Sequence, residues 1–204
     1  MLGKVNLKGR SGFTLIELAI VLVIIGLILG SILKGQEMIK NAKMKRIKSD
    51  VDGIVAATYS YQDRYNYLPG DDPTDRSGNP PAGFGATGCR GGNGDGLFGS
   101  SNERTCFWQE LAGAGFMSGD PSQNDEIKVA KRTPFGGRYL VRYANNINSS
   151  GKSGNYIYVE NVPTEIIKSL DEKYDDGEYN KGTIQCDYDY TTSRAYADIY
   201  WLAF

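Results

Sequence analysis

The chain has 204 residues, a formal net charge of −1 and no histidine. Without an imidazole, Ser-His-Asp and Cys-His catalysis and histidine-ligated zinc or haem are excluded. The length suits one domain with an appendage, and the near-neutral charge predicts no nucleic-acid partner. Hydrophobic residues make up 40% of the chain, yet its mean hydropathy is −0.40. This average combines an intensely apolar beginning with a polar, glycine-rich remainder.

The beginning of the chain joins a short basic segment to a long apolar one. Residues 1–12 contain Lys4, Lys8 and Arg10 and no acid, and residues 13–33 form an apolar run of 21 residues. At about 1.5 Å per residue, a helix of this length measures about 31 Å. Because the hydrocarbon core of a bilayer is about 30 Å thick, the run is predicted to span a membrane. A buried core helix of such uniform apolarity would need a larger protein around it.

A cleavable secretory signal is the rival interpretation, since it also begins with basic residues before an apolar run. Its apolar region is usually shorter, however, and a small-x-small cleavage site should follow it. Only Gly30 and Ser31 offer a weak candidate for such a site, and Ile32, Leu33 and Lys34 come directly after them. Ordinary signal cleavage after the run is therefore not expected.

Glu17 is the one acidic residue inside the apolar run. A carboxylate in a membrane is costly unless it is paired. Residues 14–17 fit the S/T-x-x-E capping box, in which the glutamate bonds a backbone N–H group at the start of the helix. The alternative hypothesis is that Glu17 meets a cation supplied by another chain.

The string from Gly12 to Glu17, with its basic leader, resembles the class III signal of type IV pilins and pseudopilins. The resemblance implies that a membrane prepilin peptidase cuts between Gly12 and Phe13 on the cytoplasmic side and then N-methylates Phe13. The apolar stretch would remain as a membrane anchor and later become the core of a filament. In that filament, Glu17 would neutralise the α-amino group of Phe13 in a neighbouring subunit.

The same resemblance implies partners and a location. The partners are other pilin-like subunits in a homo- or hetero-oligomeric filament, the prepilin peptidase and methylase, and the inner-membrane assembly machinery. The chain would cross the bacterial inner membrane once, with a cytoplasmic N-terminus and a periplasmic C-terminal domain, and would then enter a periplasmic or cell-surface filament. Charge alone does not decide this orientation, because basic residues also follow the span, at positions 34, 40, 43, 45, 46 and 48.

The expected function is that of a non-enzymatic structural subunit of a type IV pilus or a type II secretion pseudopilus. A minor pilin that binds a surface or a substrate at a filament tip is the second hypothesis. A single-pass membrane-anchored enzyme is the third, but no nucleophile motif and no histidine support it. The sequence does not separate pilus from pseudopilus, or a major from a minor subunit.

Residues 34–68 are predicted to continue the helix beyond the membrane. Their apolar side chains recur at spacings of three and four, the helical period, and Pro69 then ends the pattern. One helix from about Phe13 to Tyr67 would be about 80 Å long. We expect the apolar stripe to pack on the rest of the chain, with a coiled-coil stalk as the alternative.

Residues 69–204 are predicted to form an outer globular domain. Residues 69–125 hold 13 of the 26 glycines and 5 of the 7 prolines, which is typical of loops. After residue 125, alternation of apolar and polar residues predicts strands. Pro163 predicts the start of a helix. The expected strands cover residues 138–144, 156–159, 183–190 and 195–202, and short helices cover residues 104–112 and 163–173. The simplest assembly is α+β, with a small antiparallel sheet on the amphipathic half of the long helix, which is similar to the pilin fold.

The three cysteines are Cys89, Cys106 and Cys186. The sequence contains no C-x-x-C motif, so a zinc site is not expected. An outward-facing domain sees an oxidising compartment, which favours one disulfide. A bond between Cys89 and Cys106 would tie the glycine-rich loop to its short helix, and a bond between Cys106 and Cys186 is the main alternative. Cys186 lies on the apolar side of its strand, so we favour a buried free thiol there.

Two segments carry the oxygen donors that calcium prefers. Asn93 and Asp95 lie in a glycine-rich string, and Asp175 and Asp176 lie in an acidic cluster. Neither segment fits the EF-hand pattern, and the alternatives are a glycine turn and a capped helix end. Some pseudopilins bind calcium in a loop of the outer domain, so the resemblance supports the idea. No other cofactor is expected.

Ten of the 14 tyrosines follow Arg138. Such an aromatic surface can stack on bases or sugars. The alternating spacing of these tyrosines instead predicts packing on the sheet, and the absence of an accompanying Arg/Lys cluster argues against DNA binding.

Overall fold

The computed structural model describes residues 12–73, 89, 92–123, 125–147, 152–191 and 194–203. Residues 1–11 of the expected leader and much of the expected loop 69–125 lie outside these ranges. The chain divides into two compact units, Met1–Ala42 and Lys43–Phe204. The elements are α1 (Leu15–Tyr65), α2 (Ser101–Gly113), α3 (Glu126–Val129), β1 (Tyr139–Asn145), β2 (Ser153–Pro163), α4 (Thr164–Tyr174), β3 (Ile184–Cys186) and β4 (Tyr196–Leu202).

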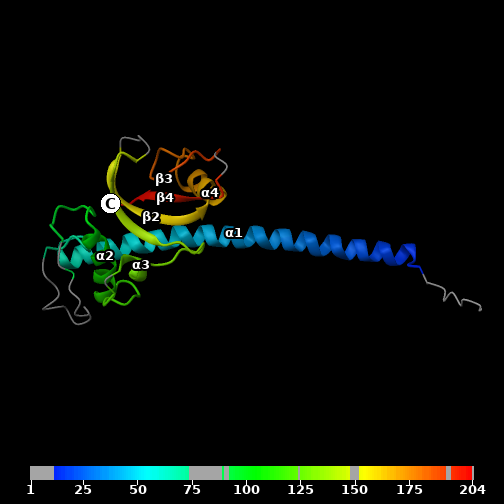
Figure 1. Cartoon of the computed structure of the whole chain (residues 1–204), viewed down its shortest axis with the longest axis horizontal. Helices are drawn as coiled ribbons and strands as arrows, with labels where there is room; N and C mark the ends of the chain where they lie inside the picture. Colours follow the sequence, from blue (N-terminus) through cyan, green and yellow to red (C-terminus); the bar gives the residue numbers. More distant parts are fainter. Residues whose placement is uncertain are drawn as a thin grey trace, which may run out of the picture. The chain divides into compact units, whose positions relative to one another are not determined.

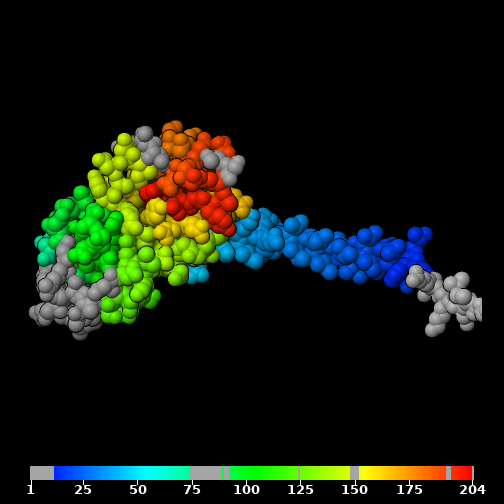
Figure 2. All heavy atoms as spheres, viewed as in Figure 1, coloured from blue at the N-terminus to red at the C-terminus, as the bar shows by residue number. Residues whose placement is uncertain are grey.

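The described part of the first unit is dominated by the beginning of helix α1. This helix runs for 51 residues without interruption, and it is long and apolar enough to cross a membrane by length and composition. In residues 15–33 the leucine, isoleucine and valine side chains are exposed. This stretch lies in the blue segment of Figure 2. Leu15 is 88% exposed and Leu27 is 69% exposed. Such a surface needs an apolar environment, which a bilayer or neighbouring helices would supply.

The second unit contains a four-stranded antiparallel sheet in the order β1-β2-β4-β3. Figure 1 shows the long strand β2 curving beside β4. The register brings apolar residues together across neighbouring strands, with Val141 opposite Ile157, Ile157 opposite Trp201, and Trp201 opposite Ile184. A bulge interrupts the pairing of β2 with β4 between Val159 and Val162.

The core of this unit lies between the sheet and the second half of α1. The helix buries residues spaced three or four apart, as the sequence pattern predicts. They are Met44, Ile47, Val51, Ile54, Ala57 and Tyr61, and they share one hydrophobic cluster with the strands. The predicted α+β architecture, with the amphipathic half of the long helix packed on a small antiparallel sheet, is therefore confirmed.

A partly buried ion pair between Asp50 and Lys131 fastens α1 to the rest of the unit. Asp50 Oδ1 accepts a hydrogen bond from Lys131 Nζ at 2.7 Å, and Asp50 Oδ2 accepts one from the Tyr139 hydroxyl at 3.0 Å. Burial, and then the charge of Asp50, raise the pKa of Tyr139 well above its ordinary value, so the phenol stays protonated as a donor. The two bonds join residues far apart in sequence, and they hold the helix in one position against β1.

Replacing Asp50 with alanine is expected to lower the free energy of unfolding by about 2–3 kcal/mol. The change removes a charged hydrogen bond from Lys131 and leaves the buried hydroxyl of Tyr139 without its acceptor. The matched control is Asp52→Ala, because Asp52 is exposed and pairs with Lys48 on the same helix. This change should alter the free energy of unfolding by less than about 0.5 kcal/mol. Urea unfolding of the detergent-solubilised chain, followed by tryptophan fluorescence, measures both, and equal effects would contradict the structural role.

Three predicted element boundaries were wrong. The strand expected at residues 156–159 is the longer β2, Ser153–Pro163. The strand expected at residues 183–190 is only the three-residue β3, because residues after Cys186 turn away from β4. The hydroxyl of Tyr190 instead donates to Asp171 on α4, at 2.7 Å. Helix α2 begins before the expected residue 104, because Ser100 and Glu103 form a capping box that supports an earlier start. Helix α3 was not predicted; it is a single turn of residues capped by Asp125.

Candidate functional site

The residues of the N-terminal signal lie at the exposed start of α1. Gly12, Phe13 and Thr14 precede the helix, and Phe13 is 83% exposed. Glu17 Oε2 accepts hydrogen bonds from both the backbone N–H and the hydroxyl of Thr14, each at 2.8 Å. The backbone N–H of Glu17 donates to Thr14 Oγ1 at 3.3 Å. The capping box expected from residues 14–17 is thus formed within the chain.

This geometry leaves part of the Glu17 carboxylate accessible. Both hydrogen bonds fall on Oε2, and Oε1 accepts none from the described residues. The side chain is exposed, and residues 18–33 that follow it carry no charge. A capping role and a pairing role are therefore compatible, because one oxygen serves the helix while the other faces outward.

A disulfide joins Cys89 to Cys106, with their Cα atoms 5.2 Å apart. It links the glycine-rich loop at Cys89 to helix α2. Cys186 is a buried free thiol on β3, and burial raises its thiol pKa. A raised pKa keeps this cysteine protonated and unreactive, so we assign it a packing role.

The glycine-rich loop is organised by a buried carboxylate that sequence reasoning did not single out for this role. Asp71 accepts hydrogen bonds from the backbone N–H of Gly94 at 2.9 Å and of Gly96 at 2.6 Å. Burial raises the pKa of Asp71, while these two bonds oppose that shift. Gly92 allows the close approach, because an added Cβ there would lie 2.0 Å from the backbone of Asp71. The loop around Gly94 and Gly96 is therefore held by its hydrogen bonds to Asp71, a residue distant in the chain.

Asn93 and Asp95 use their side-chain oxygens to close this turn. Asn93 Oδ1 accepts from the backbone N–H of Asp95 at 2.9 Å, and Asp95 Oδ1 accepts from that of Leu97 at 2.8 Å. Asp95 Oδ2 accepts from the amide of Asn93 at 2.8 Å. These bonds match the glycine-turn alternative, and they leave few oxygen lone pairs for a cation.

The carboxylate of Asp171 lies close to those of Asp175 and Asp176. One oxygen from each lies within 4.8 Å of the others, which makes this the acidic group among the described residues that could hold a metal ion. Asp171 is fully buried and accepts from Tyr190 and from the backbone N–H of Gly177. Burial raises the pKa of Asp171, the two hydrogen bonds oppose the shift, and the neighbouring carboxylates add to it.

The sequence analysis missed Asp171, although its position four residues before Asp175 is the spacing that brings two side chains together on a helix. Calcium takes six to eight oxygen ligands, so the three carboxylates supply only part of a coordination shell. Asp175 Oδ2 also accepts from the backbone N–H of Thr183 and Ile184. Calcium binding therefore remains a proposal for this cluster, and the loop of Asn93 and Asp95 fits it less well.

The fold and the N-terminal site describe a chain with an exposed apolar helix, which begins after Thr14, and an α+β domain. Residues 7–33 match the family model of the prokaryotic N-terminal methylation motif, which is the signal of type IV pilins and pseudopilins. The resemblance seen in the string from Gly12 to Glu17 is thereby confirmed. Comparison with curated proteins and with solved structures gives no match.

The motif indicates a pilin-like or pseudopilin subunit that is a substrate of a prepilin peptidase and assembles into a filament. Proteins with this motif are structural, and the apolar helix fits membrane anchoring followed by a place in a surface filament.

Proposed function

We propose that the chain is a structural subunit of a type IV pilus or a type II secretion pseudopilus. The observation that carries the proposal is that the methylation motif covers residues 7–33, at the start of a helix whose apolar surface is exposed. In a single chain this surface has no protein partner among the described residues. Aligned copies of the helix would bury it, first in the membrane and then in the filament core.

Processing would create the charge that Glu17 is placed to meet. Cleavage between Gly12 and Phe13 frees an α-amino group, whose ordinary pKa is about 8. A buried carboxylate and a buried ammonium are each costly alone but tolerable as a pair. Pairing Glu17 of one subunit with Phe13 of its neighbour would therefore fix the register between adjacent helices.

The proposed division of the chain follows from this scheme. Residues 1–12 would be a discarded leader and residues 13–33 the span and filament core. Residues 34–68 would carry the helix into the outer domain, which is formed by residues 69–204. Removal of the leader takes away three cations and no acid, so the charge becomes 20 − 24 = −4. We place the N-terminus in the cytoplasm and the outer domain in the periplasm, with the inner-membrane assembly machinery as a partner.

Gly12→Val is expected to block leader cleavage, because a peptidase that reads this glycine at the cut site would meet a branched side chain. The uncut protein would be heavier by about 1.3 kDa, for 12 leader residues at roughly 110 Da each. Immunoblotting of membranes measures the size, and mass spectrometry of the wild-type N-terminus tests methylation of Phe13. Gly35→Ala is the control, because an added Cβ at Gly35 meets nothing within 4 Å. Normal processing of Gly12→Val would contradict the assigned cleavage site.

A minor pilin at the filament tip is the second candidate function. A polar cavity in the second unit, described below, favours it because a binding subunit needs such a surface. Abundance separates the two functions: a major subunit dominates sheared filaments, whereas a tip subunit is a trace component. Quantitative mass spectrometry of sheared filaments makes this measurement.

A further inference from the structure

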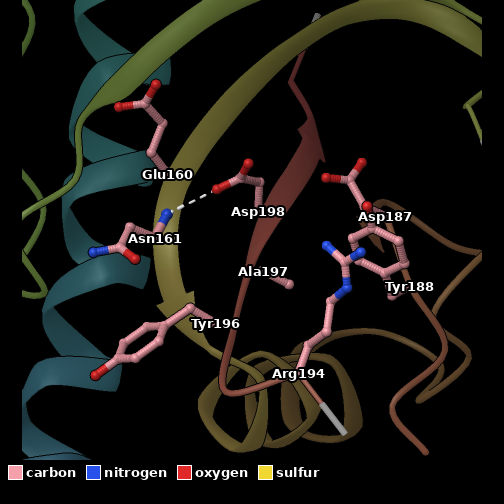
Figure 3. A pocket seen from close by; sticks show the side chains of 8 residues that line it. All are labelled: Glu160, Asn161, Asp187, Tyr188, Arg194, Tyr196, Ala197 and Asp198. Carbon is pink, nitrogen blue, oxygen red and sulfur yellow. Dashed lines mark hydrogen bonds between the residues drawn. The ribbon is translucent and has the colours of Figure 1, made fainter. Parts of the chain in front are cut away.

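A cavity of about 310 Å³ opens at one end of the sheet (Figure 3). Its residues come from three places: the bulge of β2, the beginning of β4 and the loop between β3 and β4. They are Glu160, Asn161, Asp187, Tyr188, Arg194, Tyr196, Ala197 and Asp198. The volume lies at the lower end of the range of small-molecule sites, about 300–1,000 Å³. None of these residues has a role in the N-terminal signal, so the cavity needs its own explanation.

Two of the carboxylates in the cavity are held in place by half-buried tyrosines. Asp198 accepts from the hydroxyl of Tyr158, and Asp187 accepts from that of Tyr200. The two tyrosine rings contact each other edge to face, with centroids 4.9 Å apart. Burial and the hydrogen bond to Asp198 raise the pKa of Tyr158, so its hydroxyl remains a donor. The acceptors of the cavity are therefore oriented before any ligand binds, which lowers the entropic cost of binding.

The bulge in β2, at Glu160 and Asn161, forms another wall of the cavity. Asn161 has a φ of 58°, an uncommon value for a residue other than glycine. In this conformation its backbone N–H leaves the ladder and donates to Asp198 Oδ1 at 2.8 Å, the dashed line in Figure 3. The neighbouring Gly137 permits the bulge, because a Cβ there would lie 2.1 Å from the carbonyl oxygen of Glu160. Bulges of this kind re-aim side chains beside binding sites.

The cavity also contains a fixed donor. The guanidinium of Arg194 lies over the ring of Tyr188, with 3.7 Å between its central carbon and the ring centroid. Figure 3 shows this side chain rising toward Asp187 on the same wall. Stacking on the ring fixes the plane of the guanidinium, while its N–H groups remain at the edge of the cavity. Three carboxylates and one guanidinium thus line one small space.

The arrangement discriminates between ligand classes. Glu160, Asp187 and Asp198 do not form a group with metal-ligand spacing among the described residues, and three carboxylates would repel an anion. An organic ammonium would use the carboxylates but would offer no acceptor to Arg194. A sugar hydroxyl both donates and accepts, so adjacent hydroxyls on one ring can bond a carboxylate and a guanidinium together.

We propose that this cavity binds a saccharide, with Asp187 and Asp198 accepting hydrogen bonds from ring hydroxyls and Arg194 donating to a hydroxyl oxygen. The site is independent of filament assembly: a subunit of either filament, or a tip subunit, would carry it on the outer domain. The ligand class is a neutral glycan residue, free or at the end of a longer chain.

The test uses the full chain in a detergent without a sugar headgroup, because a maltoside detergent would itself occupy the cavity. The probes are the methyl glycosides of glucose, galactose, mannose, N-acetylglucosamine and N-acetylgalactosamine, followed by saturation-transfer NMR. At least one should bind saturably below about 20 mM. Arg194→Ala and Asp187→Asn should each weaken that binding by at least about tenfold. Arg194 is exposed, so its removal should leave the fold intact, which circular dichroism checks.

Arg64→Ala is the matched control. Arg64 is also an exposed arginine over an aromatic ring, 4.9 Å from the centroid of Phe116, but it does not line the cavity. Its variant should bind the glycoside like the wild type. Failure of every glycoside to bind, equal binding by all variants, or displacement of the glycoside by butylammonium would each overturn the saccharide assignment. Because filament yield plays no part in the readout, these outcomes leave the proposed function separately testable.

Discussion

Replacing Glu17 with valine is expected to leave the protein in the membrane and to abolish its assembly into filaments. The substitution makes the apolar run continuous, so membrane insertion should be at least as favourable as before. It removes the carboxylate that would meet the α-amino group of Phe13 in the next subunit, and an unpaired charge in the filament core is costly. We expect recovery in sheared filaments to fall at least about tenfold, as measured by immunoblotting against the membrane pool.

Glu17→Gln separates the two roles of this side chain. Glutamine also serves in a capping box, so it can keep the bond to the backbone N–H of Thr14 while removing the charge. If charge pairing drives assembly, the glutamine variant should fail like the valine variant. Assembly at wild-type levels would show that capping alone is the role of Glu17. Glu37→Ala is the control for an acidic residue on the same helix, because Glu37 is exposed and pairs with Lys34.

Removal of the disulfide with Cys89→Ala and Cys106→Ala is expected to lower the free energy of unfolding by about 3 kcal/mol. The bond joins residues 17 positions apart, and opening it lets the unfolded chain regain loop entropy. The segment it closes contains the loop that Asp71 organises and the start of α2, so loss of the bond should also loosen both. Urea unfolding of the full chain in detergent measures the effect.

Reductant provides the internal control for this prediction. It should destabilise the wild type by the same amount and should leave the double variant unchanged, because Cys186 is already a free thiol. Peptide mass mapping without reduction should recover Cys89 linked to Cys106. Recovery of Cys106 linked to Cys186, or a reductant effect on the double variant, would contradict the observed pairing.

The features predicted most fully from the sequence are contiguous in the chain. The signal from Gly12 to Glu17 is read in six successive positions, and the family match covers the same region. The long helix follows from its period and from the proline after residue 68, and its observed end at Tyr65 is close to the expected one. Local patterns carry such features because helix geometry repeats every few residues.

The less accurate predictions involve residues distant in the chain. The alternation at residues 183–190 is compatible with a strand, but β3 ends at Cys186 because the chain turns to place Tyr190 against Asp171. Asp171 also belongs to the acidic group with Asp175. The spacing of residues along the chain does not indicate which hydroxyl group will donate to a buried carboxylate. That pairing depends on which helices, strands and loops become neighbours in the fold.

The sequence by itself determined the N-terminal methylation motif, the apolar helix, the α+β architecture and the position of Glu17 inside the apolar run. Each depends on the identity or period of neighbouring residues. Only the tertiary structure decided how Asp50 meets Lys131, how Asp71 holds the glycine-rich loop, and which residues line the cavity at the bulge of β2. These contacts depend on strand order and on a one-residue irregularity in register. The physical reason is that long-range pairing is selected by the packing of the whole core, whereas helix period and a linear signal are encoded locally.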